Sequence, residues 1–323
     1  MSEREARVLI FHDQPESFLD DLKVRFPGLP IEACARAEDL EAALARLKPT
    51  VAFSVKCEGL PGPVQARLLD CPSLEWIQVG GAGVDHLAKA AGRPLIVTNG
   101  AGVLSPFMAE TVMGAILLLN YGFHRYLRQQ AARQWQQNPW LPLAGKRLLV
   151  IGLGNIGQRV AAHSRSFGMT VTGLRARPAP LDGFDEVYGL NQLHEALAGA
   201  DVVSLHVPLT PDTRGLIDSA ALAVMKPGAI LVNTSRGGVV EEAALLAALR
   251  EKRIAGAHMD VFETEPLPAK SPLWALDNLV ITPHWSDSVA DWPARFASFF
   301  GDNLERWLAG RPLENVVDLA RGY

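Results

Sequence analysis

The stretch RLLVIGLGNIGQRVAAHSRSFG (residues 147–168) decides the fold of the second half of the chain. An apolar run typical of a buried strand leads into the glycine turn GLGNIG (152–157), and a segment with helical spacing follows. In such a unit the first glycine permits a tight turn, the second lets the backbone approach a pyrophosphate, and the third lets the helix pack on the strand. The helix N-terminus faces the anion. We expect cofactor contacts from Gly152, Gly154, Asn155, Ile156 and Gly157, although a tight turn without a ligand would also account for the pattern.

Two arginines follow the next expected strand, where many dinucleotide-binding proteins have an acid. VTGLRARP (171–178) contains Arg175 and Arg177, and no acid occurs before Asp182. Arg175 lies close to the offset of about 20 residues at which a carboxylate binds the ribose hydroxyls. A carboxylate repels a 2′-phosphate, whereas a guanidinium pairs with it through two parallel hydrogen bonds. We expect NADP(H) to be preferred, with NAD(H) as the alternative, unless both arginines are ordinary solvated residues at a strand end.

Strand-like and helix-like segments alternate along most of the chain, which predicts parallel strands with helical crossovers. Expected strands are 7–12, 50–55, 74–80, 95–100, 146–152, 169–174, 201–207, 229–235, 254–261 and 279–284. Expected helices are 16–26, 38–47, 105–135, 241–252 and 295–310. The fold class is therefore α/β, with two Rossmann-like or flavodoxin-like domains, parallel sheets and a cleft between them.

The long helical region 105–135 interrupts the alternation, and a second α/β series begins after it. The final helix, 295–310, has no obvious strand partner in the second series, so we expect it to return to the first domain. These observations predict a discontinuous substrate-binding domain, 1–99 and 288–323, and a cofactor domain, 100–287. The apolar residues Met113, Ile116, Leu117, Leu118 and Leu119 of helix 105–127 suggest a homodimer interface, unless the flanking domains cover them.

Composition narrows the classes of partner. With 323 residues and 48% hydrophobic residues, the chain can form about two packed domains. A formal net charge of −4 gives no general attraction to nucleic acid or to an anionic membrane. The longest apolar stretch near a helix, 112–123, is too short to span a bilayer, and the N-terminus lacks a signal-peptide pattern. Three cysteines without CxxC spacing or a histidine cluster indicate reduced thiols, a cytoplasmic location and no metal site.

Motifs spread along the chain resemble those of the D-isomer-specific 2-hydroxyacid dehydrogenases. They are GGAGVDHL (80–87), GLGNIG, HVPLTPDTRGLI (206–217), NTSRGG (233–238), HMDVFETEPLP (258–268) and ITPHWSD (281–287). GAGVD and the terminal ARGY are most similar to the glyoxylate/hydroxypyruvate reductase branch. The resemblance implies that Arg236 binds and polarises a 2-oxo acid, that His284 supplies the proton and that Glu265 pairs with His284. It also implies that the substrate carboxylate meets the backbone amides of Ala82 and Gly83.

The chemistry asks for the same residue types independently. Hydride transfer to a carbonyl carbon leaves negative charge on oxygen, and histidine has a suitable intrinsic pKa for protonating it near neutral pH. A carboxylate orients the ring and favours its protonated form, and a planar guanidinium can contact carboxylate and carbonyl together. Each residue alone has another explanation: Arg236 as a loop charge, Glu265 as part of a turn, and His284 as a core histidine at a strand end.

Further cofactor contacts follow from position. His206, Val207 and Pro208 end a strand beside the glycine turn, and Thr213 lies in the loop after it. The resemblance places the nicotinamide near Thr234, Ser235 and Asp260, although Asp260 could instead cap a helix or turn. The sequence is compatible with two roles for each of two further residues. Lys56 either faces the cleft or is a solvated lysine, and Trp285, where many relatives have a small residue, either shapes the substrate pocket or packs at the hinge.

These observations predict an enzyme that reduces a small 2-oxo acid, glyoxylate or hydroxypyruvate by preference, with hydride from NADPH. An NAD-dependent dehydrogenase for a larger D-2-hydroxy acid is the alternative within enzymes. A nucleotide-sensing corepressor on the same scaffold is the alternative outside them. The Arg–Glu–His set argues against the corepressor, because binding alone does not need a general acid.

Overall fold

In a computed structural model the chain is described for residues 5–57, 59–90 and 92–319, and it divides into two compact units. Unit 1 comprises Met1–Leu104 with Ala290–Tyr323, and unit 2 comprises Ser105–Val289. The expected limits, 99/100 and 287/288, lie a few residues before the structural ones. The terminal ARGY falls outside the described residues.

Unit 1 contains a parallel five-stranded sheet in the order β2-β1-β3-β4-β5, which is the flavodoxin-like order. Its strands are β1 (Val8–Phe11), β2 (Ile31–Cys34), β3 (Val51–Ser54), β4 (Trp76–Val79) and β5 (Ile96–Thr98). Its α-helices are α1 (Leu19–Arg25), α2 (Leu40–Leu47), α3 (Gly62–Gln65) and α10 (Trp292–Leu308). Short 3-10 helices are η1 (Pro15–Ser17), η2 (Ala37–Asp39), η3 (Ala66–Asp70) and η4 (Asp85–Ala90).

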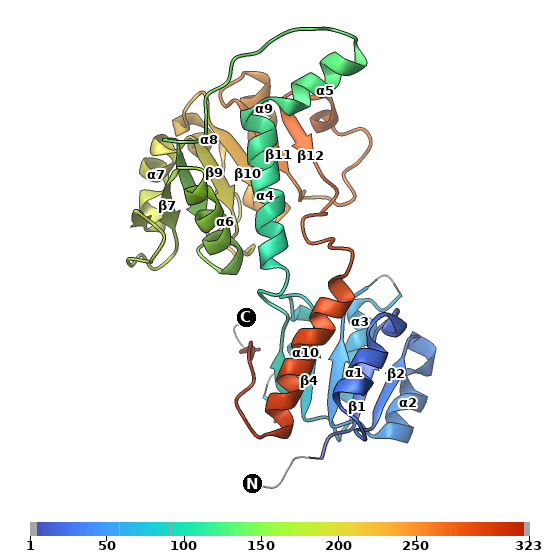
Figure 1. Ribbon diagram of the computed structural model, residues 1–323. Coiled ribbons are helices and arrows are strands. Elements are labelled where there is room, and N and C mark those ends of the chain that lie inside the picture. The colour runs from blue at the N-terminus through green and yellow to red at the C-terminus, as the bar shows by residue number, and fades with distance from the viewer. Residues whose placement is uncertain (1–4, 58, 91, 320–323) are drawn as a thin grey trace. The chain divides into compact units, whose positions relative to one another are not determined.

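The C-terminal helix α10 returns to unit 1, as the sequence predicts (Figure 1). Phe300 of α10 stacks on Phe53 of β3 with ring centroids 5.0 Å apart and lies 5.4 Å from the ring of Trp76. A buried hydrogen bond joins Asn303 of α10 to Gln78 of β4. Aromatic burial and this polar contact together fix the helix on the sheet.

Unit 2 contains a parallel seven-stranded sheet in the order β12-β11-β10-β9-β6-β7-β8, which is a Rossmann order extended by one strand. Its strands are β6 (Arg147–Ile151), β7 (Thr170–Leu174), β8 (Glu186–Tyr188), β9 (Val202–Leu205), β10 (Ile230–Asn233), β11 (Gly256–Met259) and β12 (Leu279–Ile281). Its α-helices are α4 (Ser105–Asn120), α5 (Phe123–Ala131), α6 (Asn155–Ser166), α7 (Leu193–Gly199), α8 (Ser219–Val224) and α9 (Glu242–Arg250). Short 3-10 helices are η5 (Leu190–Gln192), η6 (Gly237–Val239) and η7 (Pro272–Ala275). The predicted α/β fold class with parallel sheets is confirmed.

Strand alternation divides the core of unit 2 between the two faces of the sheet. Leu148 and Val150 of β6 pack with α4 and α6 on one face, whereas Leu149 and Ile151 pack with α7, α8 and α9 on the other. All four side chains are fully buried. A strand buried on both faces is expected to read as a continuous apolar run, as this one does.

The helical region expected over 105–135 is two helices. Gly122 adopts a left-handed conformation with φ of 70°, and α4 and α5 meet there at an angle of 64°. Within the described ranges, no single helix has the length and apolar character needed to cross a membrane, and only this bent pair taken together reaches them.

The apolar side of α4 is covered within unit 2. Met113, Ile116 and Leu119 are 8% exposed or less, and Leu117 and Leu118 pack against the same cluster. Helix α6 and strand β10 supply the covering surface (Figure 1). Met113, Ile116 and Leu119 are therefore covered by unit 2 itself, and the homodimer stays a prediction.

Candidate active site

The glycine turn between β6 and α6 has the geometry of a phosphate-binding turn. Gly152 has φ of 98°, and a Cβ atom there would lie 2.4 Å from the backbone oxygen of His206. A Cβ atom at Gly157 would lie 2.1 Å from the oxygen of Gly152. At Gly154, the N-cap of α6, a Cβ atom would meet nothing within 4 Å. The turn is tight on its protein side and open at the helix N-terminus, which suits a dinucleotide pyrophosphate.

Arg175 lies at the same edge of the sheet as the glycine turn. Ile151 of β6 pairs with Leu174 of β7, so Arg175 follows β7 where Gly152 follows β6. One end of its guanidinium donates from Nη2 to the oxygen of Ala179, while Nε is buried without a hydrogen-bond partner. Arg177 is exposed. Two cations therefore stand beside the position where the glycine turn would hold a nucleotide.

His284 and Glu265 form a pair within unit 2. The Nδ1 atom of His284 lies 2.8 Å from Oε2 of Glu265. The other carboxylate oxygen, Oε1, accepts a hydrogen bond of 2.9 Å from the backbone amide of Phe262. With the proton of Nδ1 donated to the carboxylate, Nε2 is the ring atom left to hold or release a proton. The side chains are 45% and 36% exposed, so solvent can reach the pair.

The loop that carries Arg236 is organised by Asn233, a buried residue at the end of β10. Its Oδ1 accepts from the amide and the hydroxyl of Ser235 at 3.0 and 2.6 Å, and its Nδ2 donates to the oxygen of Arg236 at 3.2 Å. A Cβ atom at Gly237 would lie 1.9 Å from the backbone carbon of Phe262. The Arg236 loop thus packs against the segment that leads to Glu265.

Asp260 follows β11 and is 1% exposed. Its carboxylate accepts hydrogen bonds from the Thr282 hydroxyl and from the backbone amides of Trp285 and Ser286. Burial alone would raise the pKa of Asp260, but these bonds outweigh burial and lower it. The resemblance predicts a nicotinamide contact here, whereas the observed partners all belong to the histidine loop, residues 282–286.

The strand-end residues of β9 and β10 form a second polar group. Nε2 of His206 lies 2.8 Å from the Ser204 hydroxyl, and Nδ1 lies 3.4 Å from the Thr234 hydroxyl. Burial lowers the pKa of His206 to about 3, so the ring is neutral near pH 7. His206 donates its amide to the oxygen of Ile151 at 2.7 Å, which brings this strand end beside the glycine turn.

Thr213 closes its own loop. Its hydroxyl donates to the oxygen of Pro208 at 2.6 Å and accepts from the amide of Thr210 at 2.8 Å. The residue is 9% exposed. Its side chain therefore shapes the loop after β9, and its expected contact with the cofactor stays a prediction.

In unit 1 the expected substrate amides lie in the turn after β4. Gly81 has φ of 72°, and both Ala82 and Gly83 are exposed. Asn99 holds this turn, because its Nδ2 donates to the oxygen of Ala82 at 2.9 Å. Lys56 follows β3 at the same edge of the sheet and is exposed. Asn99, like Asn233, is a supporting residue that sequence reasoning did not single out.

Comparisons with known proteins identify the family of the chain. The family model "D-isomer specific 2-hydroxyacid dehydrogenase, NAD binding domain" matches residues 113–286, more than half of the chain. The chain belongs to the D-isomer-specific 2-hydroxyacid dehydrogenase family. The resemblance seen in the sequence is thereby confirmed.

Three relatives illustrate the range of the family. A D-3-phosphoglycerate dehydrogenase of Methanocaldococcus jannaschii is 36% identical over 76% of this chain, but the match spans only 48% of that relative's length. A family protein from Aeromonas salmonicida has a structure with TM-score 0.83 and 36% identity, covering 97% of this chain and 99% of that one. The NADPH-dependent glyoxylate/hydroxypyruvate reductase from Sinorhizobium meliloti, in complex with NADP and sulfate, has TM-score 0.81 and 27% identity, covering 98% and 100%.

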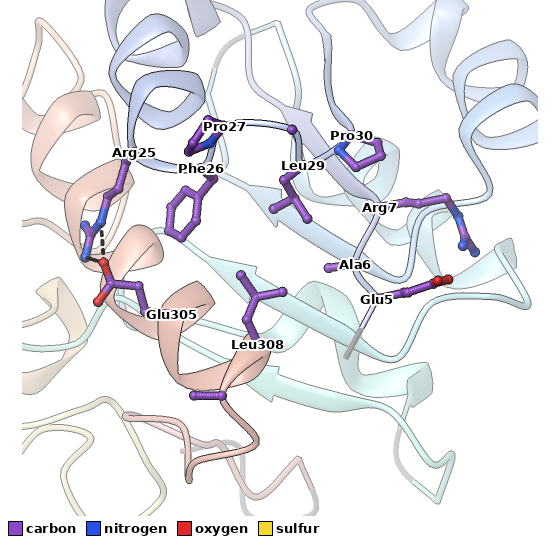
Figure 2. Close-up of a pocket in the computed structure, with 12 residues that line it drawn as sticks. Glu5, Ala6, Arg7, Arg25, Phe26, Pro27, Leu29, Pro30, Glu305 and Leu308 are labelled. Carbon is purple, nitrogen blue, oxygen red and sulfur yellow. Dashed lines mark hydrogen bonds and ion pairs between the residues drawn. The ribbon is translucent and has the colours of Figure 1, made fainter. Parts of the chain in front are cut away.

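A separate hollow of about 830 Å³ lies in unit 1 at the amino ends of its strands, opposite the edge that carries Ala82 and Gly83 (Figure 2). Ala6 and Arg7 precede β1, and Pro30 precedes β2, so the hollow lies where these strands begin. Ligands of open parallel sheets bind where the strands end. The dehydrogenase site is therefore not assigned to this hollow. Among the described residues, no group of three or more His, Cys, Asp or Glu side chains could hold a metal ion.

We predict that unit 2 loses stability in mild acid because two buried histidines resist protonation. Burial lowers the pKa of His258 to about 4 and that of His206 to about 3, from 6.5. The unfolded chain takes up these protons below about pH 6.5, so the stability that both residues contribute above that pH is lost as the pH falls toward 4. Since one pKa unit corresponds to about 1.4 kcal/mol, the loss amounts to a few kcal/mol.

Urea unfolding of wild type and His258→Gln between pH 7 and 4.5 measures the effect. The variant should lose less free energy of unfolding than wild type over that range. His194→Gln, at an exposed position on α7, is the control and should follow the wild-type profile. Parallel profiles for wild type and His258→Gln would refute the assignment.

Proposed function

We propose that this family member reduces a small 2-oxo acid to the 2-hydroxy acid, with His284 as the general acid. The observation that carries the proposal is the 2.8 Å contact between His284 Nδ1 and Glu265 Oε2, on an imidazole that is 45% exposed. A binding protein has no need of an oriented acid that solvent and substrate can reach. The relation to a glyoxylate/hydroxypyruvate reductase supports the substrate class.

The roles of the residues follow from the charge that develops on the substrate. NADPH, held at the glycine turn, would supply the hydride for the carbonyl carbon. Nε2 of His284 gives its proton to the carbonyl oxygen, and Glu265 orients the ring through its contact with Nδ1. Arg236 binds the carboxylate and polarises the carbonyl, because its planar guanidinium can contact both. Ala82 and Gly83 bind the substrate carboxylate through their backbone amides.

We propose NADP(H) as the preferred cofactor, bound at the glycine turn. Arg175 and Arg177 stand at the strand edge where an acid would select the ribose hydroxyls of NAD(H). The buried and unpartnered Nε of Arg175 supports this choice, since a polar group of that kind favours a hydrogen-bonding ligand. The Sinorhizobium relative is named as NADPH-dependent.

Two other functions make different demands on the same site. An NAD-dependent dehydrogenase for a larger substrate would oxidise NADH faster than NADPH, and it would favour 2-oxo acids longer than hydroxypyruvate. A nucleotide-sensing protein would bind cofactor and oxidise none. A steady-state panel of 2-oxo acids with both cofactors separates the three. Absence of turnover with every pair would overturn the proposed reaction.

We propose that the chain forms a homodimer through the exposed arm, residues 121–141, rather than through α4. Phe123 and Leu127 lie one turn apart on α5 and are 53% and 63% exposed, and Trp135 is 97% exposed. Trp140 is 54% exposed and its ring meets Tyr121 edge-on at 4.4 Å. Figure 1 shows α5 and the chain after it standing away from the sheet of unit 2. A cluster of this kind favours burial against a second copy.

The first prediction for this site concerns the proton donor. His284→Ala should lower kcat by about a hundredfold to ten-thousandfold, the usual contribution of general acid catalysis. The dissociation constant of NADPH should stay near the wild-type value, because the imidazole is assigned to the substrate. His194→Ala is the control. Turnover close to wild type in His284→Ala would mean that another group supplies the proton.

The second prediction concerns the cofactor. Arg175→Asp should raise the KM of NADPH by roughly tenfold to a hundredfold, the effect of losing a charged hydrogen-bonded contact, and should favour NADH relative to NADPH. Arg250→Asp, which makes the same charge change at the exposed end of α9, should leave both values unchanged. A wild-type enzyme that prefers NADH would contradict the prediction.

The third prediction concerns assembly. Light scattering should give a dimer mass at micromolar concentration, and Trp135→Lys should shift the mass toward the monomer because it places a charge in an apolar interface. Val24→Lys, at an 80% exposed position of α1, should leave the mass unchanged. A monomeric wild type would refute the proposal.

A further inference from the structure

The backbone of His284 has an unusual conformation. Its φ is 50°, in the left-handed region that residues with a side chain seldom occupy. Such a conformation persists only where neighbouring contacts hold it. The histidine loop follows the short strand β12 (Leu279–Ile281) and is exposed at His284 and Trp285. Within the loop, the His284 amide lies 3.1 Å from the oxygen of Thr282, and a stronger contact comes from outside it.

Asp260 accepts hydrogen bonds from three successive backbone amides of this loop. Its main-chain oxygen accepts from His284 at 2.8 Å, its Oδ1 from Trp285 at 2.8 Å and its Oδ2 from Ser286 at 3.1 Å. One residue at the end of β11 therefore holds His284 and the two residues after it. A charged acceptor makes such bonds stronger than neutral ones.

Two further side chains hold the Asp260 carboxylate in place. The Thr282 hydroxyl donates to Oδ1, and Nε2 of His258 lies 3.0 Å from that hydroxyl. A hydroxyl has one proton to donate, and Thr282 donates it to Asp260. The Thr282 oxygen therefore accepts a hydrogen bond from His258, whose ring proton lies on Nε2. His258 lies on β11 and is 4% exposed. The three side chains form a relay that runs from His258 through Thr282 to Asp260.

We propose that Asp260 is a positioning residue for catalysis, and that Thr282 and His258 orient its carboxylate so that it fixes the histidine loop. This inference rests on the proposed function, because it takes His284 to be the general acid. It differs from the contact with nicotinamide that the resemblance implies for Asp260.

The sharpest variants alter Thr282, because valine and threonine have nearly the same shape. Thr282→Val removes the donor to Asp260 and the acceptor for His258, whereas Thr282→Ser keeps the hydroxyl. His258→Leu and His258→Gln form a second matched pair, in which the amide of glutamine can still donate. Loss of positioning should lower kcat about tenfold to a hundredfold in Thr282→Val and His258→Leu. The serine and glutamine variants should retain most of the wild-type kcat.

Two further measurements separate positioning from other roles. The dissociation constant of NADPH should remain within about twofold of wild type in all four variants. Amide hydrogen exchange in the peptide that contains residues 282–288 should be faster in Thr282→Val and His258→Leu than in wild type. The matched variants, Thr282→Ser and His258→Gln, should exchange at the wild-type rate. Asp260→Asn should show the same faster exchange, since Trp285 and Ser286 donate to different carboxylate oxygens and the amide nitrogen that replaces one of them cannot accept a hydrogen bond.

The results distinguish a positioning role of Asp260 from a contact with the cofactor. Unchanged kcat and unchanged exchange in Thr282→Val would overturn the inference, and so would equal losses in the valine and serine variants. A large rise in the dissociation constant of NADPH with normal exchange would identify Asp260 as a cofactor contact instead. If wild type reduces no 2-oxo acid, the proposed function fails, while the exchange measurements still test whether the relay holds the loop.

Discussion

Parallel register is the constraint on which the site in unit 2 depends. Because neighbouring strands run in the same direction, β6, β9, β10, β11 and β12 all end at one edge of the sheet. Residues far apart in sequence thereby reach the same edge, each in the first few positions after its strand. The glycine turn, the Arg236 loop, Asp260 and the histidine loop are four such positions. A change of register in any one strand would move its loop away from the others. The positions of the site residues therefore depend on the pairing of the buried strands.

The features that the sequence predicts are those with a local cause. Gly152 is required because a Cβ atom at this position would collide with the backbone of His206. The run before it is apolar because both faces of the sheet are covered. The features it misses depend on distant partners. Strand β2 (Ile31–Cys34) is a four-residue edge strand with partly exposed middle residues, and β8 (Glu186–Tyr188) has three residues, so neither has a clear pattern of its own. Asp260 is visible as an acid in a motif, but its partners lie about two dozen positions away and only the fold brings them together.

Buried polar side chains fix the conformations of the loops. Asn233, fully buried at the end of β10, makes three hydrogen bonds within the next three residues and so sets the path that leads to Arg236. Asn99 plays a similar part for the turn at Ala82. A buried amide costs free energy unless its hydrogen bonds are made, so these residues specify one loop conformation and penalise the others. The loops can therefore be short and exposed at their tips without losing their shape.

The proposed proton donor and the residues that support it lie in opposite environments. His284 is 45% exposed, so its ring can exchange protons with substrate and solvent, and its partner Glu265 is 36% exposed. Asp260, which never needs to change its charge, is 1% exposed and kept ionised by its hydrogen bonds. His258 behind it is kept neutral by burial. Solvent screens the interaction between His284 and Glu265 but not the hydrogen bonds of the buried Asp260 carboxylate. The loop should therefore keep its position when the charge of His284 changes.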